Sequence, residues 1–326
     1  MRVRPEHRSL TICLVLLCGS LAANGEDRST AHSMELLTLR SKIFANTRTI
    51  RIWLPPGYHQ NSQSKQRYPV FYFTDGIATF HGRQLDRIAE QLILSRKIPP
   101  TIFVGIDNGG STLESKNPGS DRANEYLPYP DDFLLPPVPN PQGKLFPEFL
   151  EREVRPLVEA RYRTTGTIGL AGASYGAAIA LFTVMENPGR YQWLLLESPS
   201  LYIGNDALLR RSETFRNLPS RVYVGAGTNE GEGDAKREMV DDVTRFVKSI
   251  QNRTSSCLVV VRGAEHSEDA WRARLPAALE FLLGGETCPK ATAKIPNSDA
   301  SRVHGPLRAN DRLDQAAFMR ASPRRP

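Results

Sequence analysis

The fold is decided by residues 167–181, which read TIGLAGASYGAAIAL. An apolar run leads into a Gly-x-Ser-x-Gly pentapeptide centred on Ser174, and small and apolar residues follow it directly. This order is typical of a nucleophile elbow, in which a buried strand ends, the chain turns sharply at the serine and a helix begins. Gly172 and Gly176 fit that geometry, because a Cβ at either position would collide where strand and helix pass close to the turn. The flanking pattern favours the elbow over an ordinary turn between strand and helix.

On both sides of this stretch, apolar runs alternate with segments of helical spacing. The predicted strands are 68–73, 101–106, 165–171, 191–196, 221–226 and 257–261, and the predicted helices are 78–95, 145–161, 175–186, 207–215, 234–250 and 266–283. This alternation indicates an α/β protein with a mainly parallel sheet covered by helices on both faces. Residues 34–43 and 48–54 predict an antiparallel N-terminal edge. Sheets of this kind bind ligands at the carboxyl ends of their strands.

The two ends of the chain differ in composition from the middle. Residues 1–25 carry three arginines, then a 14-residue apolar run and small residues, which predicts a signal peptide and a periplasmic or secreted protein. The run is shorter than the roughly 18 residues of a membrane span, so no stable membrane insertion is expected after cleavage. Residues 289–326 lack periodicity and predict a disordered basic tail. One domain is expected over 26–288, with an insertion loop at 109–143 beside the cleft.

The net charge of +7 does not indicate a nucleic-acid partner, because it is confined to the two ends. The first 25 residues hold three Arg and one Glu, and the last 38 hold eight Lys or Arg and three Asp, so residues 26–288 contain 31 basic and 31 acidic residues. The four histidines of this segment have no i,i+4 partner, and the sequence has neither a Cys-x-x-Cys pair nor a Gly-rich phosphate motif. Neither a metal nor a cofactor is therefore expected.

A serine nucleophile needs a base, and His266 is the predicted one. In chains with such an elbow the order is serine, acid, histidine, and only His266 and His304 follow Ser174. His304 lies in the predicted tail, whereas His266 follows the last predicted strand. Position and elimination together favour His266.

The acid that orients the imidazole is expected in the loop after strand 221–226. Glu230 is far enough past the strand to turn back toward an imidazole. Glu232 has glycine on both sides, which favours a solvated side chain, and Asp234 can cap the next helix. Glu197, after the preceding strand, is the remaining candidate. Any of these carboxylates could hold the histidine tautomer and stabilise the imidazolium.

An oxyanion hole is expected from two backbone amides. One is the N–H of Tyr175, the residue after the nucleophile, and the other comes from the loop after strand 68–73. Ile77, just past Asp75 and Gly76, is the predicted second donor. Such amides stabilise the negative charge that develops when a carbonyl is attacked.

Several runs together resemble the putative-esterase family of α/β-hydrolases, which includes enterochelin esterases, esterase D, feruloyl and acetyl-xylan esterases and mycolyltransferases. These runs are LPPGY at 54–58, YPVFYFTDG at 68–76, GASYG at 172–176, SPSL at 198–201 and GAEH at 263–266 with Trp271. The resemblance covers roughly residues 34–285. It implies an α/β-hydrolase fold, with Ser174 as nucleophile and His266 as base.

The resemblance also favours Glu230 as the acid and Tyr175 and Ile77 as oxyanion donors, although some members manage with a Ser–His pair. It makes Asp75 and Arg122 candidate substrate contacts, and a structural Arg–Glu pair within the block 122–126 is the alternative. The implied activity is cofactor-free hydrolysis of a small-molecule or saccharide ester, as in enterochelin esterases. Acyl transfer to a sugar or lipid, and a non-catalytic binding module, are the alternatives.

Two cysteines remain after the predicted signal peptide, Cys257 and Cys288. Cys257 begins the last predicted strand, at the end of the sheet opposite the elbow, and the last helix returns the chain toward that level. In an oxidising compartment the two are expected within reach of a disulfide, which needs Cα atoms less than about 7 Å apart. A free, buried Cys257 with a mobile Cys288 is the alternative.

Overall fold

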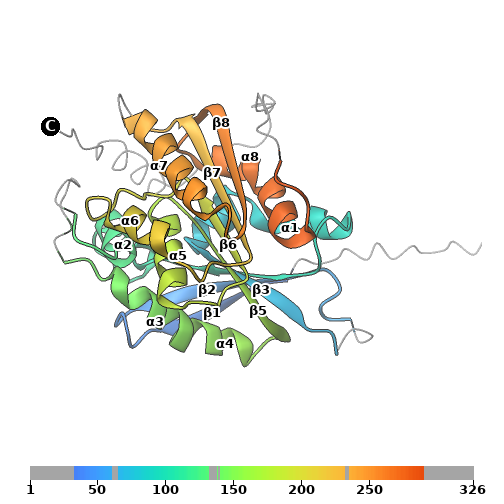
Figure 1. Ribbon diagram of the computed structural model, residues 1–326. Coiled ribbons are helices and arrows are strands. Elements are labelled where there is room, and N and C mark those ends of the chain that lie inside the picture. Colours follow the sequence, from blue (N-terminus) through green and yellow to red (C-terminus); the bar gives the residue numbers. More distant parts are fainter. Residues whose placement is uncertain (1–32, 61–64, 132–137, 139, 232–234, 290–326) are drawn as a thin grey trace, which may run out of the picture. The chain divides into compact units, whose positions relative to one another are not determined.

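Figure 1 shows the computed structural model of the chain, which describes residues 33–60, 65–131, 138, 140–231 and 235–289. Every described residue belongs to the same compact unit of the chain. The predicted signal peptide, and all but the first residue of the predicted tail, lie outside the described residues. The candidate acids Glu232 and Asp234 also lie outside them.

The described residues form one sheet of eight strands in the order β1-β2-β4-β3-β5-β6-β7-β8. β1 pairs antiparallel with β2 and β2 with β4, and all other neighbouring strands are parallel. The predicted mixed sheet with an antiparallel N-terminal edge is confirmed. The strands are β1 (Ser33–Arg40), β2 (Thr47–Leu54), β3 (Tyr68–Thr74), β4 (Ile102–Ile106), β5 (Thr164–Ala173), β6 (Trp193–Glu197), β7 (Arg221–Asn229) and β8 (Ser255–Glu265).

Helices cover both faces of the sheet (Figure 1). One face packs against α1 and α8 with the turns η2 and η6, and the other packs against α2 to α7. The helices are α1 (Leu85–Leu94), α2 (Pro118–Tyr126), α3 (Phe146–Phe149), α4 (Arg155–Glu159), α5 (Tyr175–Glu186), α6 (Ala207–Thr214), α7 (Ala235–Ile250) and α8 (Glu268–Leu279). The shorter turns are η2 (Ala78–Gly82), η3 (Gly109–Ser111), η4 (Gly143–Leu145), η5 (Leu150–Val154) and η6 (Glu280–Gly284).

β5 and α5 lie at the centre of the molecule because their sequences are apolar on every side. All residues of β5 from Ile168 onward are buried, and so is every residue of α5 except its last. A helix that is apolar all round belongs in a core rather than at a surface. The turn between β5 and α5 is therefore held from all directions, which positions Ser174 rigidly.

Two helix predictions are wrong in detail. The predicted helix at 78–95 is two pieces, η2 and α1, because Gln84 between them has a φ of 55° and interrupts the right-handed turn. The insertion at 109–143, predicted as a loop, contains α2. The sequence of α2, PGSDRANEY, has no apolar stripe that would signal a helix. Ion pairs to the sheet hold it instead.

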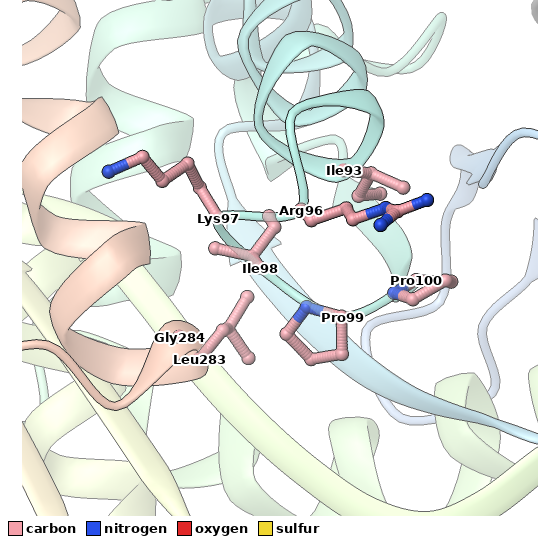
Figure 2. Close-up of a pocket in the computed structure, with 8 residues that line it drawn as sticks. All are labelled: Ile93, Arg96, Lys97, Ile98, Pro99, Pro100, Leu283 and Gly284. Atoms are coloured by element: carbon pink, nitrogen blue, oxygen red, sulfur yellow. The ribbon is translucent and has the colours of Figure 1, made fainter.

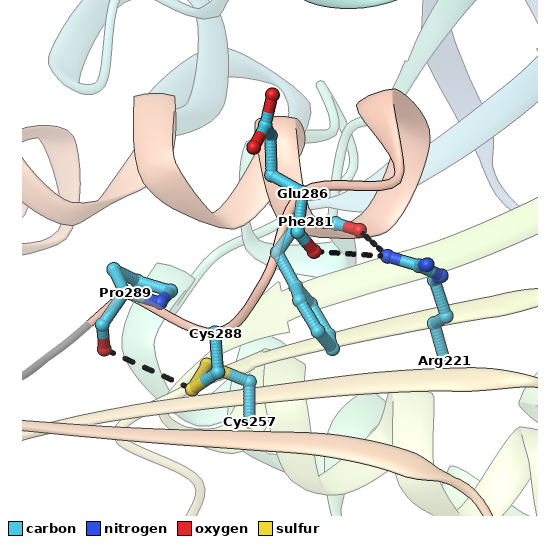
Figure 3. The surroundings of a disulfide bond; sticks show 6 residues. All are labelled: Arg221, Cys257, Phe281, Glu286, Cys288 and Pro289. Carbon is cyan, nitrogen blue, oxygen red and sulfur yellow. Dashed lines mark hydrogen bonds between the residues drawn. A yellow bond between two sulfur atoms is a disulfide. The ribbon is translucent and has the colours of Figure 1, made fainter.

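A disulfide joins Cys257 in β8 to Cys288, with Cα atoms 5.2 Å apart (Figure 3). It lies at the amino ends of the strands, the edge opposite Ser174. Arg221, at the start of β7, donates hydrogen bonds to the backbone oxygens of Phe281 and Glu286 and so ties the same segment to the sheet (Figure 3).

A groove of about 530 Å³ opens between the end of α1, Pro99-Pro100 and Leu283-Gly284 (Figure 2). Pro99-Pro100 precede β4, so the groove lies at the amino edge of the sheet and not at the edge that carries Ser174. None of the helices within the described ranges combines the length and apolar character needed to cross a bilayer.

Candidate active site

Ser174 occupies the turn between β5 and α5 with φ 58° and ψ −127°. This conformation is strained for a residue with a side chain, and such strain persists only where the surroundings over-determine it. The two glycines of the pentapeptide make it possible: a Cβ on Gly172 would lie 2.1 Å from the backbone oxygen of Gly176, and one on Gly176 would lie 2.4 Å from Thr74 Oγ1. The turn has the geometry of a nucleophile elbow.

The side chain of Ser174 is buried, and its Oγ forms no hydrogen bond with any of the residues that the structure describes. Its backbone N–H donates to the oxygen of Glu197 at the end of β6, 2.9 Å away. Burial of a hydroxyl without a hydrogen-bond partner destabilises the folded protein, so native proteins retain such a group mainly where it has a function. Nucleophilic attack on a substrate is one such function.

His266 and Glu230 are brought together by the register of the last two strands. β7 and β8 are parallel neighbours (Figure 1). Asn229 pairs with Glu265 at their carboxyl ends. The next residue of each chain segment therefore leaves the sheet at the same point. His266 Nδ1 lies 3.0 Å from Glu230 Oε2. The expectation that α8 begins at His266 is wrong, because Ser267 caps the helix by accepting the Ala270 N–H.

Among the candidate acids that the structure describes, Glu230 contacts the histidine and Glu197 does not. Glu197 is buried and pairs with the Arg274 guanidinium at 2.7 to 2.8 Å. Burial raises the pKa of Glu197, and the charge of Arg274 counters only part of that rise. The role of Glu230 as the acid stays a prediction, and its geometry fits that role.

Glu230 is held on its second oxygen as well. Oε1 accepts the Gly227 N–H at 2.5 Å and lies 2.7 Å from Ser198 Oγ. Ser198 Oγ also accepts the Trp271 indole N–H at 2.8 Å. Ser198 and Trp271 belong to the motifs quoted above, but sequence reasoning attached no role to them.

The two predicted oxyanion donors differ in their surroundings. Tyr175 is the first residue of α5, and the amides of a first helical turn point out of the helix at its N-terminus. The Ile77 N–H donates a hydrogen bond to the Asp107 carboxylate. Burial raises the pKa of Asp107, and this hydrogen bond is one of the interactions that counter the rise. To serve as an oxyanion donor, the Ile77 amide must turn from Asp107 to the substrate. Its role stays a prediction.

Asp75 and Arg122, the predicted substrate contacts, bind one another. Arg122 donates to both carboxylate oxygens at 2.8 Å, and Asn108 Nδ2 donates to Oδ1 at 2.7 Å. Burial alone would raise the pKa of Asp75, but the charge and hydrogen bonds of Arg122 outweigh it and lower that pKa. The occupied carboxylate favours an anchoring role for Asp75 over contact with substrate.

The ion pairs of α2 also test whether Arg122 and Glu125, within the block 122–126, pair with each other. Glu125 pairs with Arg48 of β2 at 2.7 Å and Arg122 with Asp75 at 2.8 Å, so the alternative of a pair within the block is replaced by two pairs outside it. The Tyr126 hydroxyl accepts the backbone N–H of Asp75 at 3.1 Å. Three successive contacts thus fasten α2 to the sheet next to the elbow, and the guanidinium of Arg122 lies over the ring of Tyr175 at 5.8 Å.

No cluster of three or more potential metal-ligating side chains exists within the described ranges. The groups that the arrangement offers are a serine hydroxyl, an imidazole paired with a carboxylate, and helix-terminal amides. This combination suits attack on an acyl group.

The chain is similar to a family of esterases and to several hydrolases of known structure. The model of the putative-esterase family matches residues 41–282. The uncharacterized protein YbbA of Bacillus subtilis is 23% identical over 251 residues, which cover 74% of this chain and 94% of YbbA. An IroE-like serine hydrolase from Shewanella oneidensis superimposes with a TM-score of 0.64 at 21% identity, over 77% of this chain and 80% of the hydrolase. Siderophore hydrolase EstA from Aspergillus nidulans superimposes with a TM-score of 0.64 at 18% identity, over 85% of this chain and 98% of EstA.

The chain belongs to the putative-esterase family, since the family model matches well over half of it. The α/β-hydrolase fold expected from the sequence is confirmed by the sheet order and by these structural neighbours. Membership of this family identifies the chain as a carboxylic ester hydrolase.

Proposed function

We propose that this chain is an exported serine hydrolase that cleaves its ester through an acyl-enzyme on Ser174. His266 takes the proton of Ser174 during attack and returns it to the leaving alcohol. Glu230 holds the imidazole with its proton on Nδ1, and the amides of Tyr175 and Ile77 stabilise the oxyanion. The observation that carries the proposal is the 3.0 Å contact of His266 Nδ1 with Glu230 Oε2, at the sheet edge that holds the strained serine.

The proposed substrate is a siderophore ester, as for enterochelin esterases. Support comes from the likeness to siderophore hydrolase EstA, which extends over 85% of this chain. Feruloyl, acetyl-sugar and simple aliphatic esters are the competing substrates.

Export is proposed from two observations. The layout of residues 1–25 is that of a signal peptide. The disulfide between Cys257 and Cys288 fits an oxidising compartment, where such bonds form and persist.

The test is hydrolysis by the purified protein, without its predicted leader, of a panel that holds a trilactone siderophore, a feruloyl ester, an acetylated sugar and p-nitrophenyl acetate. We expect the highest kcat/KM on the siderophore and loss of all turnover in Ser174→Ala, with an unchanged circular dichroism spectrum. Preference for another ester would refute the substrate class. Acyl product on an added sugar or lipid acceptor, in place of free acid, would refute hydrolysis. Absence of turnover on every ester, or turnover that survives Ser174→Ala, would refute the proposal as a whole.

A further inference from the structure

The hydroxyl of Ser198 lies at the centre of a buried polar cluster behind the His266–Glu230 pair. Ser198 is fully buried, and its Oγ lies 2.7 Å from Glu230 Oε1, 2.8 Å from Trp271 Nε1 and 3.4 Å from Arg274 Nη2. Glu230 and Trp271 are nearly as buried. Every member of this cluster is shielded from solvent, so each hydrogen bond in it acts in a low-dielectric environment.

The chemistry of these groups fixes the direction of every hydrogen bond. An indole N–H and a guanidinium can only donate, so Trp271 and Arg274 both use Ser198 Oγ as an acceptor. The one hydroxyl proton of Ser198 is then left for Glu230 Oε1. A carboxylate that accepts from Ser198 and from the Gly227 N–H has that oxygen fully engaged as an acceptor.

The other oxygen of Glu230, Oε2, faces His266 Nδ1 at 3.0 Å. An ionised Oε2 can only accept, so the Nδ1 of His266 must carry the proton. The other ring nitrogen, Nε2, is then the atom with the free electron pair that a base requires. The tautomer of His266 follows from donors two hydrogen bonds away, Trp271 and Arg274.

The backbone and the packing hold this cluster in place. Ser198 has a φ of 44°, a strained conformation for serine that aims its side chain at Glu230. Trp271 also contacts the histidine directly, with its ring edge-on to the imidazole at a centroid distance of 5.0 Å. The guanidinium of Arg83 lies over the Trp271 ring, 5.2 Å from its centroid, and pairs with Glu268 at 2.8 Å.

Arg274 supplies the positive charge that this cluster needs. It pairs closely with Glu197 and lies 3.9 Å from Glu230 Oε1, so one guanidinium serves two buried carboxylates. A buried carboxylate without a nearby cation or hydrogen-bond donors would take up a proton. Arg274 and Ser198 thus place a positive charge and a hydrogen-bond donor beside Oε1 of Glu230.

We propose that Ser198 and Trp271 are positioning residues, which fix the orientation of the Glu230 carboxylate and thereby set the tautomer and orientation of His266. Neither touches the reacting atoms. The effect on turnover rests on the proposed function, whereas the effect on the hydrogen bond between His266 and Glu230 does not.

The test compares Ser198→Ala and Trp271→Phe with two matched controls. Ser212→Ala removes a buried hydroxyl whose bond is to the backbone of its own helix, and Trp53→Phe removes a buried indole N–H that has no partner among the described residues. Each positioning variant is expected to lower kcat by about 10- to 100-fold, the scale of a hydrogen bond to a charged group, with KM unchanged. The controls are expected to keep the wild-type kcat.

Two further readouts separate positioning from loss of packing. In the wild type, the proton between His266 Nδ1 and Glu230 is expected to give a strongly deshielded signal in the proton NMR spectrum. This signal should broaden or vanish in both positioning variants and persist in the controls. The double variant is expected to lose no more activity than Ser198→Ala alone, because Trp271→Phe keeps an aromatic ring beside His266 and removes only the N–H that Ser198 accepts.

The outcomes distinguish this proposal from the proposed function. If the deshielded signal and kcat of both positioning variants match those of the controls, or if the losses simply add, the positioning role is overturned. If the signal responds as expected but no ester is turned over by the wild type, the positioning role stands and the proposed function fails.

Discussion

Replacement of Glu230 by glutamine is predicted to lower kcat by about 10⁴-fold while the fold stays intact. The change conserves volume, and the amide oxygen of Gln can still accept from Gly227 N–H and Ser198 at the Oε1 position. The amide nitrogen then faces His266 Nδ1 and cannot accept a proton. The imidazole is forced into the tautomer with its proton on Nε2, which cannot take the proton of Ser174. Amide replacement of a triad acid has this scale of effect, equivalent to about 5 kcal/mol.

The assay is kcat on the best ester of the panel, together with the rate of labelling by a fluorophosphonate. Glu265→Gln is the matched control, since Glu265 precedes His266 but is exposed and accepts a long hydrogen bond from Asn229 at 3.4 Å. It is expected to keep the wild-type rate. A loss of less than tenfold in Glu230→Gln would refute the assignment of the acid, and so would an equal loss in the control. Loss confined to Asp234→Asn would move the acid to that residue.

Three other predictions concern the Arg122–Asp75 pair and the disulfide. Arg122→Gln is expected to lower the free energy of unfolding by about 3 kcal/mol in urea titrations, because it leaves Asp75 buried without its cation. Because the pKa of Asp75 is lowered in the folded state, the Asp75–Arg122 pair stabilises the folded protein at pH values above the ordinary pKa of 3.8. This stabilisation is lost as the pH falls through the lowered pKa, so the difference in free energy of unfolding between wild type and Arg122→Gln should shrink. A difference that grows at acidic pH would contradict this. Titration of the denatured, unreduced mature chain is expected to find no free thiol, and two free thiols would exclude the disulfide. The Cys257→Ser, Cys288→Ser double variant should lose about 3.5 kcal/mol of stability on the chain-entropy scale with kcat unchanged, and a marked drop in kcat would show that the bond supports the site.

The sequence was sufficient to place Ser174 and His266 because both are defined by local pattern and chain order. The elbow needs glycines at fixed spacing around the serine, and one histidine follows it within the predicted domain. The alternation of strands and helices was equally visible, since each element carries its own periodicity. These features are encoded over a few residues at a time.

The candidate acids could not be told apart from the residues alone, and only the family resemblance favoured Glu230, because the contact with His266 depends on strand register. β7 continues to Asn229, three residues beyond its predicted end at 226, and this extension brings Glu230 level with His266. The end of a strand depends on its neighbour as much as on its own sequence. The helix α2 was missed for a similar reason, since Arg122 and Glu125 find their partners about 47 and 77 positions away in the chain.

The central claim, that Ser174 is the nucleophile, is tested most directly by mass spectrometry of the protein after incubation with a fluorophosphonate. We predict one adduct per chain, located on the peptide that contains Ser174, and no adduct in Ser174→Ala. Labelling of the wild type should slow strongly in His266→Ala, because the base and the nucleophile act as a unit. An unlabelled wild-type chain, or an adduct on a different residue, would contradict the account.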